Sequence, residues 1–181
     1  PKGAPTIKVV GVGGGGSNAI NRMFRAPIPG VDYIVVNTDA QALQRCDTPV
    51  RIQLGERLTR GLGVGGDPET GRLASEENRE ALAELLSGAD LIFLAAGMGG
   101  GTGTGASPII AEVAKESGAL TIGVVTKPFN FEGSKRRKAA EDGVYRLKEK
   151  VDSLIVIPND RLSAVCSEEV TLNNAFQMAD N

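Results

Sequence analysis

Residues 97–105 read Gly97-Met98-Gly99-Gly100-Gly101-Thr102-Gly103-Thr104-Gly105, and six of these nine residues are glycine. The segment follows the apolar run 91–96, which predicts a buried strand, and precedes residues 106–114, which predict a helix. Glycine allows positive φ angles and a close approach of the backbone to a ligand. The N-terminus of the next helix supplies unpaired N–H groups and the positive end of its dipole. One or two glycines suffice for a tight turn, so six favour a phosphate-binding turn over a turn without a ligand.

The glycine content is the anomaly in the composition. The chain has 24 glycines among 181 residues, about 13%, against about 7% in ordinary proteins. Three stretches, 11–16, 61–71 and 97–105, hold 16 of the 24. This clustering differs from the even spread of a flexible linker. It predicts three loops in which the backbone makes a close approach.

Charge and residue usage exclude several classes of function. The net charge is −2 and there is no charged tail, which argues against a nucleic-acid partner. The two cysteines, Cys46 and Cys166, form no CxxC pair and the chain has no histidine, so a disulfide framework, a zinc site and a histidine base are not expected. The sequence shows no signal peptide and no apolar run near 18 residues. We expect a soluble cytoplasmic protein without direct membrane insertion.

Hydrophobic periodicity predicts strands that alternate with helices. The expected strands are 7–12, 33–36, 50–54, 91–96, 120–125 and 154–157. The expected helices are 19–24 with Ser17 and Asn18 as N-cap, 75–87, a helix from residue 106 with Pro108 in its first turn, 134–149 and 171–181. This order predicts an α/β domain, a Rossmann-like three-layer structure with a mostly parallel sheet and helices on both faces. We expect residues 1–181 to form a single domain whose last helix continues past the chain end.

The first glycine cluster favours a second possibility. Residues 11–16 fit the GxGxxG pattern between a strand and a helix, which is typical of dinucleotide-binding folds. Asp39 would then be the ribose carboxylate, and the chain an NAD-dependent oxidoreductase domain. Two features count against this alternative. A dinucleotide site needs only one glycine turn, and the second strand ends in Asn37 with the acid displaced to Asp39.

The second glycine cluster also differs from a P-loop. No GxxxxGK[ST] pattern occurs, and residues 97–105 contain no lysine. Phosphates would therefore be held by backbone N–H groups, by the hydroxyls of Thr102 and Thr104, and by Mg²⁺.

Several motifs together resemble one family. Residues 99–105 resemble the glycine-rich signature of the tubulin/FtsZ superfamily. Residues 36–43 (VNTDAQAL), 127–133 (KPFNFEG) and 157–160 (IPND) resemble the FtsZ branch, the bacterial and plastid division GTPases, rather than tubulin. The match extends in order over essentially the whole chain.

The resemblance implies roles for individual residues. The first glycine loop would hold the diphosphate, the signature loop the β- and γ-phosphates, Glu132 the ribose and Arg136 the phosphates. Asp180 would select guanine, supported by Asn18, Asn159 and Phe176, although Phe176 fits a plain core role equally well. Residues 61–72 resemble the loop near the γ-phosphate. The implied GTP-binding residues are Gly14, Gly15, Gly16, Ser17, Asn18, Asn37, Asp39, Gly65, Gly66, Gly99, Gly100, Gly101, Thr102, Gly103, Thr104, Gly105, Glu132, Arg136, Asn159, Phe176 and Asp180.

The resemblance also implies what the chain lacks. In the family an acidic loop after the central helix activates the attacking water on the nucleotide of the next subunit, and a C-terminal domain follows. Both would lie beyond residue 181, so no catalytic residue is expected here. We expect GTP, GDP and Mg²⁺ as ligands, with Mg²⁺ bound through phosphates, and little turnover by the chain alone. The intact protein would form filaments at a mid-cell division ring, or in the plastid stroma, and bind division proteins through its C-terminal region. Lys135, Arg137 and Lys138 are expected on a solvated helix face.

Overall fold

Apolar, largely β-branched segments form a single parallel sheet in the computed structural model, which describes residues 4–127 and 134–157. Its strands are β1 (Ile7–Val12), β2 (Val31–Asn37), β3 (Val50–Gln53), β4 (Leu91–Gly97), β5 (Leu120–Thr126) and β6 (Ser153–Ile157). They lie in the order β3-β2-β1-β4-β5-β6, and each neighbouring pair is parallel. The Rossmann-like α/β prediction is confirmed. The six expected strands are found with bounds that differ by two residues or fewer.

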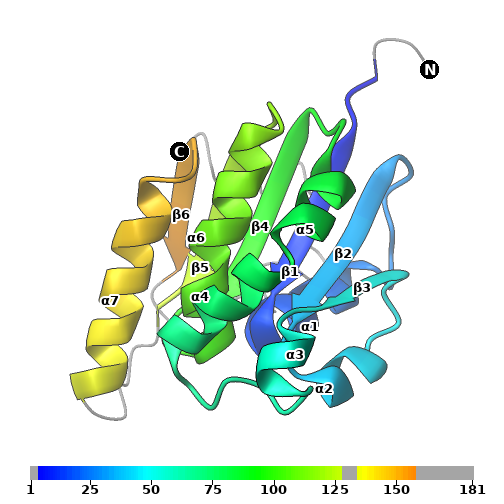
Figure 1. The fold of residues 1–181 in the computed structure, drawn as a ribbon. Helices are drawn as coiled ribbons and strands as arrows, with labels where there is room; N and C mark the ends of the chain where they lie inside the picture. The colour runs from blue at the N-terminus through cyan, green and yellow to red at the C-terminus, as the bar shows by residue number, and fades with distance from the viewer. Residues whose placement is uncertain (1–3, 128–133, 158–181) are drawn as a thin grey trace.

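Helices cover both faces of this sheet (Figure 1). They are α1 (Gly13–Met23), α2 (Ala40–Gln44), α3 (Glu56–Thr59), α4 (Pro68–Glu77), α5 (Arg79–Leu86), α6 (Gly101–Glu116) and α7 (Ser134–Lys148). One core joins alternate side chains of the strands to α4, α5, α6 and α7, and includes Ala74, Leu82, Ile110 and Leu147. The opposite core joins the other strand side chains to α1 and α2 through Ile20 and Leu43. Alternate residues of one buried strand therefore serve two cores, which explains why the strands read as continuous apolar runs.

The strand order reverses direction between β1 and β4. The chain builds β2 and β3 on one side of β1, then crosses back through α3, α4 and α5 to place β4 on its other side. Val12, the last residue of β1, is in register with Ala96 near the end of β4. In parallel α/β sheets ligands bind beyond the carboxyl ends of the strands at such a switch point. Both glycine-rich turns leave the sheet there.

Two helices begin earlier than expected. α1 begins at Gly13, so Ser17 and Asn18 lie inside the helix and the prediction that they cap it was wrong. α6 begins at Gly101 instead of Ala106, so Pro108 lies inside that helix and not in its first turn. Glycine disfavours a helix by about 1 kcal/mol relative to alanine, but packing outweighs this cost here. A Cβ at Gly16 would overlap the carbonyl oxygen of Ala95 in β4.

The region between β3 and β4 also differs from the prediction. Residues 61–71 were expected to form a loop before a helix at 75–87, but α4 begins at Pro68 and α5 follows after Asn78. Asp67 caps α4 by accepting a hydrogen bond from the Glu69 N–H at 3.1 Å. Gly71 lies inside α4, at a position where a Cβ would overlap the carbonyl oxygen of Gly101. The short helices α2 and α3 were not predicted, and the helix expected at 171–181 lies outside the described residues.

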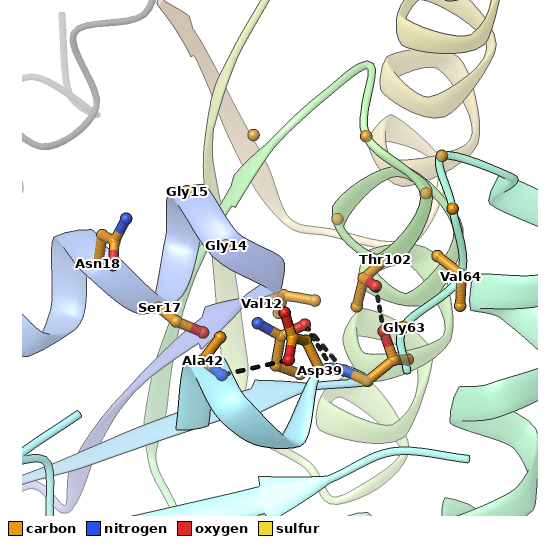
Figure 2. Close-up of a pocket in the computed structure, with 18 of the residues that line it drawn as sticks. Val12, Gly14, Gly15, Ser17, Asn18, Asp39, Ala42, Gly63, Val64 and Thr102 are labelled. Atoms are coloured by element: carbon orange, nitrogen blue, oxygen red, sulfur yellow. Dashed lines mark hydrogen bonds between the residues drawn. The ribbon is translucent and has the colours of Figure 1, made fainter. Parts of the chain in front are cut away.

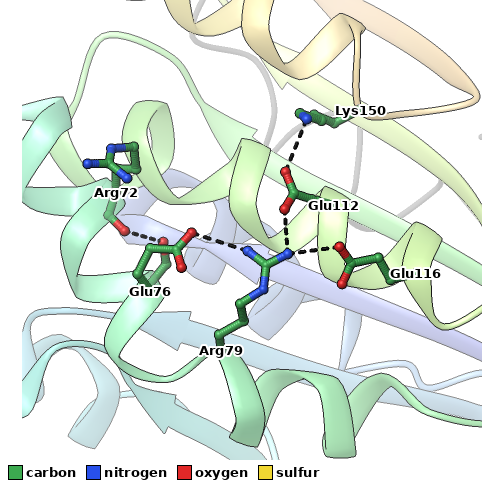
Figure 3. Close-up of polar contacts among 7 residues, drawn as sticks. Arg72, Glu76, Arg79, Glu112, Glu116 and Lys150 are labelled. Carbon is green, nitrogen blue, oxygen red and sulfur yellow. Dashed lines mark hydrogen bonds and ion pairs between the residues drawn. The ribbon is translucent and has the colours of Figure 1, made fainter.

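An ion-pair network fastens α4 and α5 to α6 (Figure 3). The Arg79 guanidinium pairs with Glu76 at 3.2 Å, with Glu116 at 2.9 Å and with Glu112. The second oxygen of Glu112 pairs with Lys150 at 3.0 Å, just after α7. These groups are partly exposed, so each ion pair is expected to stabilise the fold only modestly. Among residues 4–127 and 134–157, none of the helices is long and apolar enough to span a membrane.

Candidate functional site

A cavity of about 640 Å³ opens at the carboxyl ends of β1, β2 and β4. Its walls include the β1–α1 turn, the β2–α2 turn, the segment 62–66 and the β4–α6 turn (Figure 2). Arg136 on α7 also lines it. The volume falls in the range of small-molecule and cofactor sites. The cavity therefore lies at the place in the fold where a ligand is expected.

Two helix N-termini face this cavity. Gly14 and Gly15 line it from the first turn of α1, and Gly101, Thr102 and Gly103 line it from the first turn of α6. Neither helix has a side-chain cap, and neither carries an acidic residue in its first turn. The leading N–H groups and the positive dipole ends of both helices therefore act on the same cavity. Such an arrangement attracts a ligand with more than one negative group.

The two threonines of the signature segment have different environments. Thr102 lines the cavity, and its hydroxyl lies 2.7 Å from the hydroxyl of Thr38 at the end of β2. Thr104 is buried, does not line this cavity, and accepts a hydrogen bond from the N–H of Gly99 at 2.8 Å. The first threonine is thus available to a ligand, whereas the second fixes the turn that carries it.

The polar residues after β2 organise their own turn. The Asn37 Oδ1 atom accepts hydrogen bonds from the N–H groups of Thr38 at 2.8 Å and of Asp39 at 3.3 Å. Asp39 caps α2, because its Oδ1 atom accepts from Gln41 at 3.0 Å and from Ala42 at 3.2 Å (Figure 2). One oxygen of this carboxylate is therefore committed to helix capping, and only the other is left for a ligand.

The segment 62–66 forms the wall opposite α1. Gly63, Gly65 and Gly66 have φ angles of +86°, +61° and +84°, which residues with a Cβ rarely adopt. A backbone bridge between Leu62 and Asp39 ties this segment to the β2–α2 turn. Asp67 ends the segment, and hydrogen bonds from the Thr70 hydroxyl and the Glu69 N–H lower the pKa of its carboxyl. Glycine backbone thus makes up much of this wall. The bridge to Asp39 holds one end of the segment, and the capping residue Asp67 follows the other end.

Most residues expected from the sequence meet at this cavity. Those that line it are Gly14, Gly15, Ser17, Asn18, Asn37, Asp39, Gly65, Gly66, Gly100, Gly101, Thr102, Gly103 and Arg136. Four others do not line it, namely Gly16, Gly99, Thr104 and Gly105. Gly16 and Gly105 instead allow close packing, against Ala95 in β4 and Pro68 in α4. Glu132, Asn159, Phe176 and Asp180 lie outside the described residues.

Several wall residues were not among the nucleotide contacts that the sequence implied. Thr38 and Gly97 lie in segments that the sequence did single out, 36–43 and 97–105, and Thr126 is the last residue of β5. All three lie at the carboxyl edge of the sheet. No pattern in the sequence indicated Asn21, Arg45 or Cys46, which also line the cavity. Burial raises the pKa of the Cys46 thiol. The described residues contain no group of three or more His, Cys, Asp or Glu side chains able to hold a metal ion.

The basic residues at the start of α7 divide between two environments. Arg136 lines the main cavity. Lys135 and Lys138 line a second cavity of about 290 Å³ between α4 and α7, so the expectation of a plain solvated face does not describe them fully. Arg137 is exposed and lies 3.7 Å from Glu141, one turn away.

The sequence matches a known family along most of its length. The model of the Tubulin/FtsZ family, GTPase domain, matches residues 6–167. Cell division protein FtsZ of Buchnera aphidicola subsp. Acyrthosiphon pisum (strain APS) is 56% identical over 175 residues, which cover 97% of this chain and 46% of that protein. The FtsZ of Buchnera aphidicola subsp. Schizaphis graminum (strain Sg) has the same identity and coverage. The chain thus spans about half the length of these relatives.

Solved structures share the fold. An empty FtsZ dimer from M. jannaschii is 44% identical, with a TM-score of 0.84 over 98% of this chain and 51% of that chain. The GDP-bound monomer of CetZ1 from Haloferax volcanii is 23% identical, with a TM-score of 0.75 over 86% of this chain and 51% of that chain. The second likeness concerns the fold alone.

Proposed function

This chain belongs to the tubulin/FtsZ family, and from that premise we propose that its cavity binds GTP and GDP by their phosphates. The observation that carries the proposal is the pair of uncapped helix N-termini, α1 and α6, facing one cavity. Backbone N–H groups and helix dipoles bind phosphate without a lysine. This fits a signature segment that contains none.

Each part of the nucleotide has proposed contacts. The first turn of α1, from Gly14 to Asn18, holds the diphosphate, and the turn from Gly100 to Gly103 holds the β- and γ-phosphates. Arg136 adds a cation on the same side. Glu132 binds the ribose. Asp180 selects guanine, supported by Asn18, Asn159 and Phe176, because a carboxylate accepts hydrogen bonds from guanine N1–H and N2–H₂ and adenine presents no such pair.

The dinucleotide alternative finds less support. In that class the acid after β2 binds ribose hydroxyl groups. Here one oxygen of Asp39 caps α2, and a second glycine-rich helix start faces the cavity opposite the first. A second phosphate-binding turn is redundant for NAD and suits a nucleoside triphosphate.

Mg²⁺ fits this site as a companion of the nucleotide. Mg²⁺ keeps several waters and binds through one or two carboxylates together with substrate phosphates. Among the described residues lining the cavity the one carboxylate is Asp39, and hydroxyls of Thr38 and Thr102 lie nearby. Phosphate oxygens of the nucleotide would therefore supply most of the ligands to the ion. The ion would in turn neutralise part of the phosphate charge.

Titration calorimetry with GDP, ADP and NAD tests nucleotide choice. We expect binding of GDP, much weaker binding of ADP and none of NAD. Asp180→Ala should lower the affinity for GDP more than that for ADP, because it removes the acceptor for the guanine donors. A control, Asp142→Ala on α7, should leave both affinities unchanged. Stabilisation of the fold by NAD but not by GDP would overturn the proposal.

We further propose that hydrolysis requires a second subunit. In the described part of the cavity Asp39 is the only carboxylate, and its capping role makes it a poor base for activating water. The intact protein would hydrolyse GTP between subunits of a cytoplasmic filament at the division ring, and bind division proteins through regions outside this chain. The chain alone should bind GTP with little turnover. Phosphate release at an ordinary GTPase rate, linear in the concentration of the chain, would contradict this.

A further inference from the structure

The hydroxyls of Thr38 and Thr102 form a pair inside the cavity wall. Their oxygen atoms are 2.7 Å apart, and the residues are 1% and 8% exposed. Thr38 follows β2, and Thr102 is the second residue of α6, 64 positions later in the chain. Both residues also line the cavity. The pair thus connects two walls of the proposed nucleotide site through a single hydrogen bond.

Thr102 depends on Thr38 for this bond because of its place in α6. A hydroxyl deeper in a helix can donate to the carbonyl one turn earlier, as the Ser107 hydroxyl does to Gly103. Thr102 stands in the first turn, where no earlier helical turn exists. The Thr38 hydroxyl is therefore the partner that sets the direction of the Thr102 hydroxyl.

Thr38 is itself held firmly. Its N–H donates to the Asn37 side chain at 2.8 Å, and the Asn37 carbonyl accepts from the Leu54 N–H at 2.8 Å. Thr38 is also β-branched, which restricts its χ1 angle. Its hydroxyl therefore has a well-defined position, and the hydrogen bond to Thr102 can fix the N-terminus of α6 relative to it.

A bound phosphate determines which hydroxyl donates. Each hydroxyl has one proton and can accept through its lone pairs. If Thr102 donates to a phosphate oxygen at the start of α6, its own oxygen is free to accept, and Thr38 must be the donor. The resulting chain, Thr38 to Thr102 to phosphate, is polarised in one direction, which strengthens each bond in it.

We propose that Thr38 is a positioning residue, whose hydroxyl donates to Thr102 and so presents the Thr102 proton to the nucleotide phosphate. The inference rests on the proposed function, since it needs a phosphate at the start of α6. It predicts that Thr38 contributes to affinity only through the Thr102 hydroxyl. A direct contact between Thr38 and the nucleotide would not have this dependence.

A double-mutant cycle measured by calorimetry with GDP tests the inference. Thr38→Val keeps the shape of the side chain and removes the hydroxyl, and it should weaken GDP binding by about three- to tenfold, the factor that one hydrogen bond contributes. Thr38→Ser, the matched control, should bind GDP like the unmodified chain. Thr102→Val should also weaken binding, and adding Thr38→Val to it should cause no further loss. GMP, which lacks the β-phosphate, should bind Thr38→Val and the unmodified chain equally.

The outcomes separate the inference from the function it rests on. Equal GDP affinity for Thr38→Val and the unmodified chain, or a loss that persists in the Thr102→Val background, would overturn the positioning role. Absence of GDP binding by the unmodified chain would instead overturn the proposed function. If Thr38→Val does not fold, Thr38→Cys replaces it in the cycle, because a thiol is a weak donor. Its GDP affinity should then fall below that of Thr38→Ser, and equality of the two would overturn the inference.

Discussion

The Thr104 hydroxyl accepts a hydrogen bond from the N–H of Gly99, five residues earlier, and closes the turn between β4 and α6 from inside the protein. Both residues are buried, and the oxygen-to-nitrogen distance is 2.8 Å. Thr104→Val should therefore strand the Gly99 N–H without an acceptor and lower the free energy of unfolding by about 1–3 kcal/mol. Urea denaturation measures this change. Thr104→Ser should recover most of the loss, and equal destabilisation by both substitutions would contradict the role of the hydroxyl.

Gly14 and Gly105 both lie inside helices, but only Gly105 is required for close packing. A Cβ at Gly105 would overlap the carbonyl oxygen of Pro68, whereas a Cβ at Gly14 meets nothing within 4 Å. Gly105→Ala should lower the free energy of unfolding by about 3 kcal/mol or more, because backbone must move to admit the methyl group. Gly14→Ala, the matched control in α1, should leave stability unchanged or raise it. Thermal unfolding of the two variants distinguishes them, and similar melting temperatures would refute the packing explanation.

Asp39 should act mainly as a helix cap. Asp39→Ala removes the acceptor for the N–H groups of Gln41 and Ala42 and should lower the free energy of unfolding by about 1 kcal/mol. Asp39→Asn keeps a capping oxygen and should restore stability. Chemical denaturation of both variants tests this. If the alanine variant retains full stability, the cap has no energetic role.

Glu112 gives stability a specific pH dependence. The Arg79 guanidinium, and then Lys150, lower the pKa of this carboxyl below its ordinary value of 4.5. The folded state therefore binds its proton less tightly than the unfolded state, so the stabilisation is complete above pH 4.5 and disappears as pH falls through the lowered pKa. Glu112→Gln should be less stable than the unmodified chain by about 0.5–1 kcal/mol at pH 7, since the pair is partly exposed. The difference should shrink to nearly nothing in acid. A difference that stays constant with pH would exclude the carboxylate as its source.

The Cys46 thiol should react slowly in the folded protein. It is 6% exposed, and burial raises the pKa of its thiol, so little thiolate is present near neutral pH. In a Cys166→Ser background, alkylation by iodoacetamide should be many times faster in urea than in native buffer. GDP should slow the native reaction further, because Cys46 lines the cavity. Equal rates with and without urea would contradict this burial.

The sheet could be predicted from the sequence because its central strands, β1, β2, β4 and β5, are largely buried on both faces. Leu91–Gly97 is an uninterrupted apolar run and Ile7–Val12 is interrupted only by Lys8, and both runs are too short for a helix of ordinary length. The helix expected at 134–149 is found as α7, Ser134–Lys148. Patterns that depend on the burial of apolar side chains were thus sufficient for the architecture.

The starts of α1 and α6 could not be predicted, because glycine serves both in turns that contact a ligand and in helices that pack closely. The sequence interpretation took residues 97–105 as a turn made for a ligand, but Gly103 and Gly105 lie in α6 and let it pack onto Gly97 and Pro68. Local propensity argues against glycine in a helix. Only the tertiary contacts show why it is required there. The start of α4 did have a signal, since Asp67 followed by Pro68 is a usual N-cap and first residue, but Gly71 concealed it.

The site could be predicted only in part, because some of its features depend on contacts between residues that are far apart in the sequence. Its location follows from the carboxyl ends of the strands, so Gly14, Asn37 and Thr102 were found. Thr38 lies in the motif 36–43, but its hydrogen bond with Thr102 joins residues 64 positions apart, which no local pattern indicates. Which of Thr102 and Thr104 faces the cavity likewise depends on where α6 begins. The sequence placed that start at Ala106 instead of Gly101, so the difference between the two threonines could not be predicted.

The contact between α4 and α6 has a mechanical consequence. Backbone meets backbone there, at Gly71 with Gly101 and at Gly105 with Pro68, so no side chain can rotate to absorb a displacement. A shift of α4 must be followed by the first turn of α6 as one rigid piece. The segment 62–66, which leads into α4, and the first turn of α6, which lines the cavity, should therefore resist displacement together. Amide protons of the two helices should lose their protection against solvent exchange together, in a single opening event.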